Sequence, residues 1–208
     1  MKQWFRMATF ACLVGSAGFV AAQTPAGAGR QGGTGAGTAG KGQEPTSTAK
    51  PAPGSPAQGT PAAADAMFIR TAATDGMAEV EHGRLAAQNA TNDEVKQFGQ
   101  RMVDDHSKAG DELKGLASQK NVTLPTELDA KHKAMQDKLA KMKGEAFDRA
   151  YMSHMVTAHQ QAVSLFTRES SSGKDADAKT WAAKTLPTLQ EHLKMAQDLQ
   201  KEVAASAK

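Results

Sequence analysis

Apolar side chains recur at steps of three and four residues in five segments of the chain, and this spacing predicts five α-helices. The second segment holds His106 within its apolar stripe, four residues after Met102 and three before Ala109. A polar ring on a face that will be buried needs a partner from elsewhere in the chain. We therefore expect other helices to supply polar groups that face His106.

Signals at the helix ends define the first two elements. Asp65 is expected to cap a helix that runs to about Asn89. The capping box Thr91–Glu94 then starts a second helix, which ends near Lys120. The first helix has small residues along one face, and these would allow a neighbouring helix to approach closely: Ala72, Gly76 and Gly83.

Three more helices follow. A shorter one is expected up to Gly144, which would end it, and a longer one from about residue 145 to residue 170. The last helix begins at Asp175 and contains Pro187, which is expected to kink it because proline removes one backbone hydrogen bond.

The connections between these helices predict the topology. Short turns make the first and second helices, and likewise the last two, antiparallel neighbours, and the short third helix carries the chain back along the bundle. The predicted fold class is all-α: a ferritin-like up-down-down-up four-helix bundle with a shorter fifth helix as crossover, over residues 65–204.

The first 64 residues differ in composition from the predicted bundle. Residues 1–22 combine two early positive charges, a short apolar run and small residues up to Ala22, which is typical of a signal peptide. Residues 23–64 are rich in Gly, Ala and Pro and lack large apolar residues, so we expect a disordered linker. The expected location is therefore periplasmic, secreted or envelope-associated, with cleavage near Ala22 and no transmembrane helix in the mature chain.

Composition excludes several kinds of site. The only cysteine, Cys12, lies in the expected signal peptide, so the mature chain would have no disulfide, cysteine nucleophile or cysteine zinc site. Outside Lys2 and Arg6 the charges are nearly balanced, and no basic block with interleaved aromatics suggests nucleic-acid binding. We find no nucleophile elbow and no phosphate-binding loop, and we assign no catalytic residue. A partner in the envelope or on the cell surface, reached through the linker, is the remaining expectation.

Inward-facing polar residues form the candidate site. Imidazole and carboxylate groups that meet inside a bundle can bind a divalent transition metal, and methionines three or four residues from the histidines would also suit Cu(I). The candidate metal ligands are Glu79, His106, Asp148, His159 and His192. The same residues, with Tyr151, could instead form a hydrogen-bonded structural layer without any ion.

Other histidines are expected to lie outside this site. His132 falls on the stripe of the short crossover helix, whereas His82 and His154 are expected on the surface. Glu79 and His82 make one Glu-x-x-His pair, but a complete di-iron site would need two such pairs and two further glutamates, so we do not expect one.

Several short motifs together resemble the bacterial domain-of-unknown-function family 4142, over about Met67 to Leu199. The resemblance implies an exported, ferritin-like bundle with no established activity. His82 departs from a position that is usually apolar in the family. The motifs are Glu79-Val-Glu81, Phe98-x-Gln-Arg-Met-Val-x-Asp-His106-Ser-Lys, Phe147-Asp-Arg-Ala-Tyr151-Met, Met155-Val-x-x-His159 and Thr185-Leu-Pro-Thr-Leu-x-x-His192. The family pattern marks Glu79, His106, Asp148, Tyr151, His159 and His192.

We therefore expect an exported, non-enzymatic helical bundle of unknown biochemical activity, with a buried cluster of histidines and carboxylates that is structural or binds metal. One alternative is a periplasmic metal-binding or storage protein, or a metal-dependent oxidoreductase. Another is an envelope-stress or surface-interaction protein in which the linker carries the function.

Overall fold

The computed structural model describes residues 60–206, and within them it contains five helices and no strand. The helices are α1 (Ala63–Asn89), α2 (Asp93–Gln119), α3 (Ala130–Ala140), α4 (Gly144–Ser172) and α5 (Ala176–Ala205). The predicted all-α fold is confirmed. The expected signal peptide, residues 1–22, and nearly all of the expected linker, residues 23–64, lie outside the described residues.

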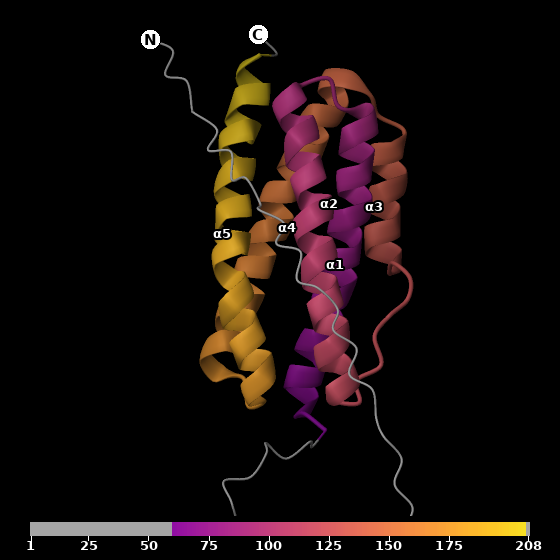
Figure 1. The fold of residues 1–208 in the computed structure, drawn as a ribbon. Helices are drawn as coiled ribbons and strands as arrows, with labels where there is room; N and C mark the ends of the chain where they lie inside the picture. Colours follow the sequence, from indigo (N-terminus) through magenta and orange to yellow (C-terminus); the bar gives the residue numbers. More distant parts are fainter. Residues whose placement is uncertain (1–59, 207–208) are drawn as a thin grey trace, which may run out of the picture. The chain divides into compact units, whose positions relative to one another are not determined.

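The four long helices form two antiparallel pairs, α1 with α2 and α4 with α5, that pack against each other (Figure 1). Helix α1 also contacts α4, and α2 contacts α5, while the short α3 lies mainly against α1. Following the chain in Figure 1 gives the predicted up-down-down-up order, with α3 as the crossover. None of the helices in the described range combines the length and apolar character needed to cross a bilayer.

The core consists of two apolar clusters, which occupy different levels of the bundle. One contains Phe98 and Tyr151, and the other contains Phe68, Phe166 and Trp181. On each of α2, α4 and α5, the residues of one cluster come before the helix's central histidine and those of the other come after it. The histidines therefore lie at the level where the two apolar clusters meet.

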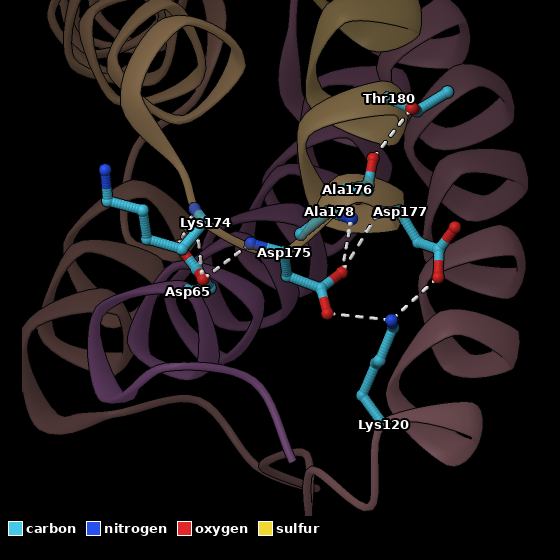
Figure 2. A network of polar contacts seen from close by, with 8 residues as sticks. All are labelled: Asp65, Lys120, Lys174, Asp175, Ala176, Asp177, Ala178 and Thr180. Carbon is cyan, nitrogen blue, oxygen red and sulfur yellow. Dashed lines mark hydrogen bonds and ion pairs between the residues drawn. The ribbon is translucent and has the colours of Figure 1, made fainter. Parts of the chain in front are cut away.

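Buried aspartates join the two helix pairs at their turns. Asp148 of α4 accepts hydrogen bonds from the backbone N–H groups of Thr91 and Asn92, just before α2. Asp65 of α1 accepts equivalent bonds from Lys174 and Asp175, just before α5 (Figure 2). The expectation that Asp65 caps its own helix is therefore wrong, because its carboxylate binds the start of another helix.

Side-chain caps complete the starts of α2 and α5. Asn92 accepts hydrogen bonds from the N–H groups of Glu94 and Val95, so the cap of α2 is Asn92 and not Thr91 as predicted. Asp175, the predicted start of the last helix, caps α5 by accepting from the second and third residues of that helix. Both caps satisfy backbone donors that the first helical turn leaves free.

A buried lysine fixes the end of α2 to the start of α5. Lys120 is 6% exposed, and its Nζ lies 2.7 Å from a carboxylate oxygen of Asp175 and 2.7 Å from one of Asp177. Figure 2 shows Lys120 reaching between these two aspartates. The charged amine is therefore paired at the place where burial would otherwise be most costly.

Helices α1 and α2 approach each other closely at two glycines. A Cβ on Gly83 would lie 2.5 Å from the carbonyl oxygen of Gly99, and a Cβ on Gly99 would lie 2.9 Å from that of Gly83. Ala72, Gly76 and Gly83 were predicted to allow such contact. Of these, Gly83 is the position where a side chain would collide with the backbone of the neighbouring helix.

Candidate metal centre

Three histidines from three helices meet inside the bundle. His106 of α2, His159 of α4 and His192 of α5 each offer a ring nitrogen, and the three nitrogens lie within 4.8 Å of one another. The ring centroids are 5.7, 5.4 and 5.4 Å apart. His159 and His192 are each 1% exposed, and the Nε2 of the half-buried His106 is itself buried.

Hydrogen bonds orient two of these rings. The Nδ1 of His159 lies 3.0 Å from the carbonyl oxygen of Met155, and the Nε2 of His192 lies 2.8 Å from a carboxylate oxygen of Asp105. When these nitrogens donate, the lone pairs fall on His159 Nε2 and His192 Nδ1. Within residues 60–206, neither of those atoms has a hydrogen-bond partner, and neither has the Nε2 of His106.

The environment favours the neutral form of each ring. Burial, together with the nearby His159 and His192, lowers the pKa of His106 to about 3. Burial is also the main cause that lowers the pKa of His159 to about 4, and it lowers that of His192 despite the bond to Asp105. Neutral imidazoles keep the lone pair that a metal ion requires.

Asp105 holds His192 in place and is itself held by an arginine. Burial acts to raise the pKa of Asp105, but hydrogen bonds to His192 and Arg101 outweigh it and leave the pKa below the usual value. The Nε of Arg101 lies 3.1 Å from the carboxylate. Ligand histidines in metal sites commonly donate to such a carboxylate. The sequence pattern missed this residue because Asp105 borders the stripe of α2 and its partner, His192, lies on α5.

Glu79 lies beside the three histidines without a hydrogen bond to them. One of its carboxylate oxygens is 4.0 Å from the Nδ1 of His159, and the other is buried without a partner among the described residues. Burial, with a further contribution from the charge of Asp75, raises the pKa of Glu79 to about 8. The Tyr151 hydroxyl nearby is also buried without a described partner, and burial and the charge of Glu79 both raise its pKa.

One predicted ligand, Asp148, and the histidine of the crossover helix, His132, lie elsewhere. Asp148 uses both carboxylate oxygens to bind the backbone before α2, so it is not part of the histidine group. His132 lies on α3 and is paired with Asp129 and Asp75. Of the five residues proposed as ligands, the structure therefore brings together His106, His159 and His192, with Glu79 at the margin.

His82 and His154 are not surface residues, contrary to our expectation. His82 is completely buried, and its Nδ1 lies 3.2 Å from the Nε2 of the half-buried His154. Burial lowers the pKa of His82 to about 4 and that of His154 to about 3. The helical pattern placed His82 at the edge of the stripe, but α3 and α4 cover that side of α1.

A cavity of about 550 Å³ adjoins the histidine group. His106, His159 and Glu79 line it on one side, and His132 and His154 line it elsewhere. Small residues account for part of the open space, because Gly76 and Ala109 also face it. His106 and His159 thus border a volume large enough for water or a small molecule.

The arrangement fits a transition-metal ion. Three imidazole nitrogens at 2.0–2.1 Å from zinc leave a fourth position open, with nitrogens roughly 3.3 Å from each other. In the structure the three nitrogens lie within 4.8 Å of one another, so the rings must move inward slightly to hold one ion. Copper, nickel and iron also accept imidazole, so the donor set restricts the ion to this class.

Comparisons with solved structures identify similar folds. A DUF305 fragment from Deinococcus radiodurans is similar with a TM-score of 0.61 and 9% identity, covering 68% of this chain and 98% of that one. A DUF305 protein from Streptomyces coelicolor has a TM-score of 0.58 and 17% identity, covering 68% and 92%. At these identities the likeness shows a shared fold alone. No curated protein matches the chain.

Residues 50–199 match the family model described as a domain of unknown function, DUF4142. The match spans most of the chain and includes every helix that supplies a residue to the histidine group. It therefore agrees with the resemblance carried by the sequence motifs, and the chain belongs to the DUF4142 family.

Proposed function

We propose that this protein binds one transition-metal ion through His106, His159 and His192. The observation that carries the proposal is the orientation of the rings: three buried nitrogens converge without partners among the described residues, while Met155 and Asp105 hold the opposite nitrogens of two rings. Metal-binding histidines are commonly oriented in this way, by a carbonyl or carboxylate that accepts from the ring nitrogen away from the ion.

A purely structural polar layer accounts less well for the same geometry. In such a layer the ring nitrogens would hydrogen-bond to one another or to Glu79, yet the closest approach of Glu79 is 4.0 Å. Leaving buried polar atoms unsatisfied costs about 1–3 kcal/mol each. Binding an ion would use all three lone pairs at once, so it offsets a cost that the layer leaves in place.

The proposed setting is outside the cytoplasm. The basic and apolar start of the chain supports export, and the similar Streptomyces protein is described as a candidate secreted protein. An exported chain without cysteine in its mature part would have to bind such ions through histidine, carboxylate or methionine. The proposed role is metal binding rather than catalysis.

The test is titration of untagged, metal-free protein with Zn²⁺ and with Cu(I). We expect the wild type to bind one ion. His106→Ala should lower the affinity ~100-fold or more, and Asp105→Asn should lower it about 10–100-fold. His132→Ala is the matched control, because that histidine is already paired with Asp129 and Asp75. It should leave this binding unchanged.

Stability without metal separates the two interpretations. His106 makes no hydrogen bond through Nε2 within residues 60–206, so His106→Ala should lose the stabilisation by added metal while the metal-free protein keeps most of its stability. If the wild type binds neither ion and His106→Ala lowers the melting temperature of metal-free protein, the cluster is structural and the proposal is wrong.

A further inference from the structure

We propose that His82 and His154 form a second site for a divalent ion of the zinc or copper class, separate from the three-histidine site. His82 comes from α1 and His154 from α4, so the pair joins the two helix pairs on the side covered by α3. Neither residue contributes to the group of His106, His159 and His192.

The distance between the two nitrogens suits an ion held by both. His82 Nδ1 and His154 Nε2 are 3.2 Å apart. Two nitrogens bound tetrahedrally to zinc at about 2.0–2.1 Å are roughly 3.3 Å apart. The rings are nearly perpendicular, with centroids 4.9 Å apart and planes at 72°. The two donor atoms are thus already at the separation of neighbouring ligands, without the inward movement that the three-histidine site requires.

A hydrogen bond between the two rings explains the distance but not the burial. The Nε2 of the fully buried His82 has no partner among the described residues, so Nδ1 is the one nitrogen of that ring that is engaged. The bond is also between two neutral groups, and its net contribution is small compared with the cost of burying two imidazoles. An ion held by both nitrogens provides a stronger interaction in return for that burial.

The cavity beside His154 supplies carboxyl groups and a route to solvent. His154 lines the cavity together with the carboxylates of Asp75 and Glu79. Asp75 is partly exposed, with 38% of its side chain accessible, whereas Glu79 is buried. The two neutral imidazoles offer donors to a cation beside a cavity that carboxyl groups also line, and water in the cavity can complete its coordination.

The test is calorimetric titration of the full chain, untagged and metal-free, with Zn²⁺. We expect two equivalents in the wild type and one in His154→Ala, which alters a half-buried residue. His82→Phe, which keeps the buried volume filled, should also bind one. His132→Ala should keep both equivalents, and His106→Ala should lose the other one.

The outcomes separate this site from the three-histidine site. Full stoichiometry in both His154→Ala and His82→Phe would overturn the second site, as would a single equivalent that only the His106 variant loses. A single equivalent that only the His154 and His82 variants lose would support the second site and contradict the function proposed for the first. No zinc binding by the wild type would overturn the second site, and the absence of Cu(I) binding as well would contradict the function proposed for the first.

Discussion

The two helix pairs, α1–α2 and α4–α5, carry equivalent residues 83 positions apart. Asp65 and Asp148 are related in this way, and each binds the two backbone N–H groups before a helix of the other pair. Asn92 and Asp175, the caps of α2 and α5, are related by the same interval. The two turns are therefore held by the same arrangement of one buried aspartate and one helix cap.

The aromatic contacts repeat as well. Phe68 and Trp181 pack edge to face with centroids 5.9 Å apart at 61°, and the residues 83 positions away, Tyr151 and Phe98, do so at 6.2 Å and 68°. Each pair joins a helix of one hairpin to a helix of the other. The repeat thus includes packing between the two halves as well as local helix signals.

The centre of the bundle breaks this repeat. The three site histidines have small or aliphatic counterparts, and all three counterparts line the cavity. His106 corresponds to Leu189, His159 to Gly76 and His192 to Ala109. At this level three positions therefore carry the candidate chemistry, and the three positions related to them by the repeat border the cavity beside it. The hydrogen bonds that hold the turns and the histidines of the candidate site therefore lie at different levels of the bundle.

The largest expected difference between the halves concerns the glycine contact. Gly83 corresponds to Phe166, so only α1 and α2 approach until backbone meets backbone. Gly83→Ala should destabilise the protein by about 3 kcal/mol, because its Cβ would lie 2.5 Å from the carbonyl oxygen of Gly99. Equilibrium unfolding in urea measures this change.

Gly115→Ala provides the control for that variant. Gly115 lies within α2 and is exposed, and a methyl group added there would meet no other atom within 4 Å. Alanine there should stabilise the helix by about 0.5–1 kcal/mol. Equal effects of the two substitutions would mean that the close approach of α1 and α2 does not contribute to stability.

Removing the repeated aspartates should reveal a smaller asymmetry. Asp148→Ala should cost about 2–3 kcal/mol, because it leaves the N–H groups of Thr91 and Asn92 without their charged acceptor. Asp65→Ala should cost less, about 1–2 kcal/mol, since it also removes a negative charge that acts on the buried Glu169. Urea unfolding of both variants at pH 8 tests the order.

The Glu169→Gln variant provides a second protein in which the cost of Asp65→Ala can be measured. In Glu169→Gln the nearby charge is absent, so the cost of Asp65→Ala should rise toward that of Asp148→Ala. An unchanged cost would show that Glu169 and Asp65 do not interact, and the difference between the two turns would need another cause.

The smallest expected effect is a pH dependence confined to the Asp65 turn. Burial raises the pKa of Glu169 to about 7, and the charge of the nearby Asp65 acts in the same direction. A carboxyl whose folded pKa is raised favours folding at low pH, and this contribution is lost as the pH rises from about 4.5 through 7. Glu169→Gln should therefore gain melting temperature relative to the wild type at pH 8.5 but not at pH 4.5. A constant difference across this range would contradict the assignment.

Helix positions and topology could be predicted because their signals are local. The apolar spacing located the five helices, and the short turns determined which helices are antiparallel neighbours. The start of α5 was also predicted, since Asp175 acts on its own helix. The role of Asp65 was not, because its bonds reach 109 and 110 residues along the chain, to Lys174 and Asp175.

The site was predictable only in part for a similar reason. Periodicity indicates which face a residue occupies, and it correctly selected His106, His159 and His192 as inward-facing. Level along the bundle is a separate condition: Asp148 precedes His159 by 11 residues, about 16 Å of helix, and so cannot reach the same ion. The small rotation that turns Asp105 toward His192 depends on how the helices pack, which no local signal specifies.

The crossed aspartates also bear on how the protein folds. Each hairpin's turn needs a carboxylate from the other hairpin, so an isolated hairpin would keep two unsatisfied N–H groups at the start of its second helix. Neither half is then self-sufficient, despite the repetition between them. The reciprocal dependence couples the halves into one cooperative folding unit, in which loosening one turn weakens the other.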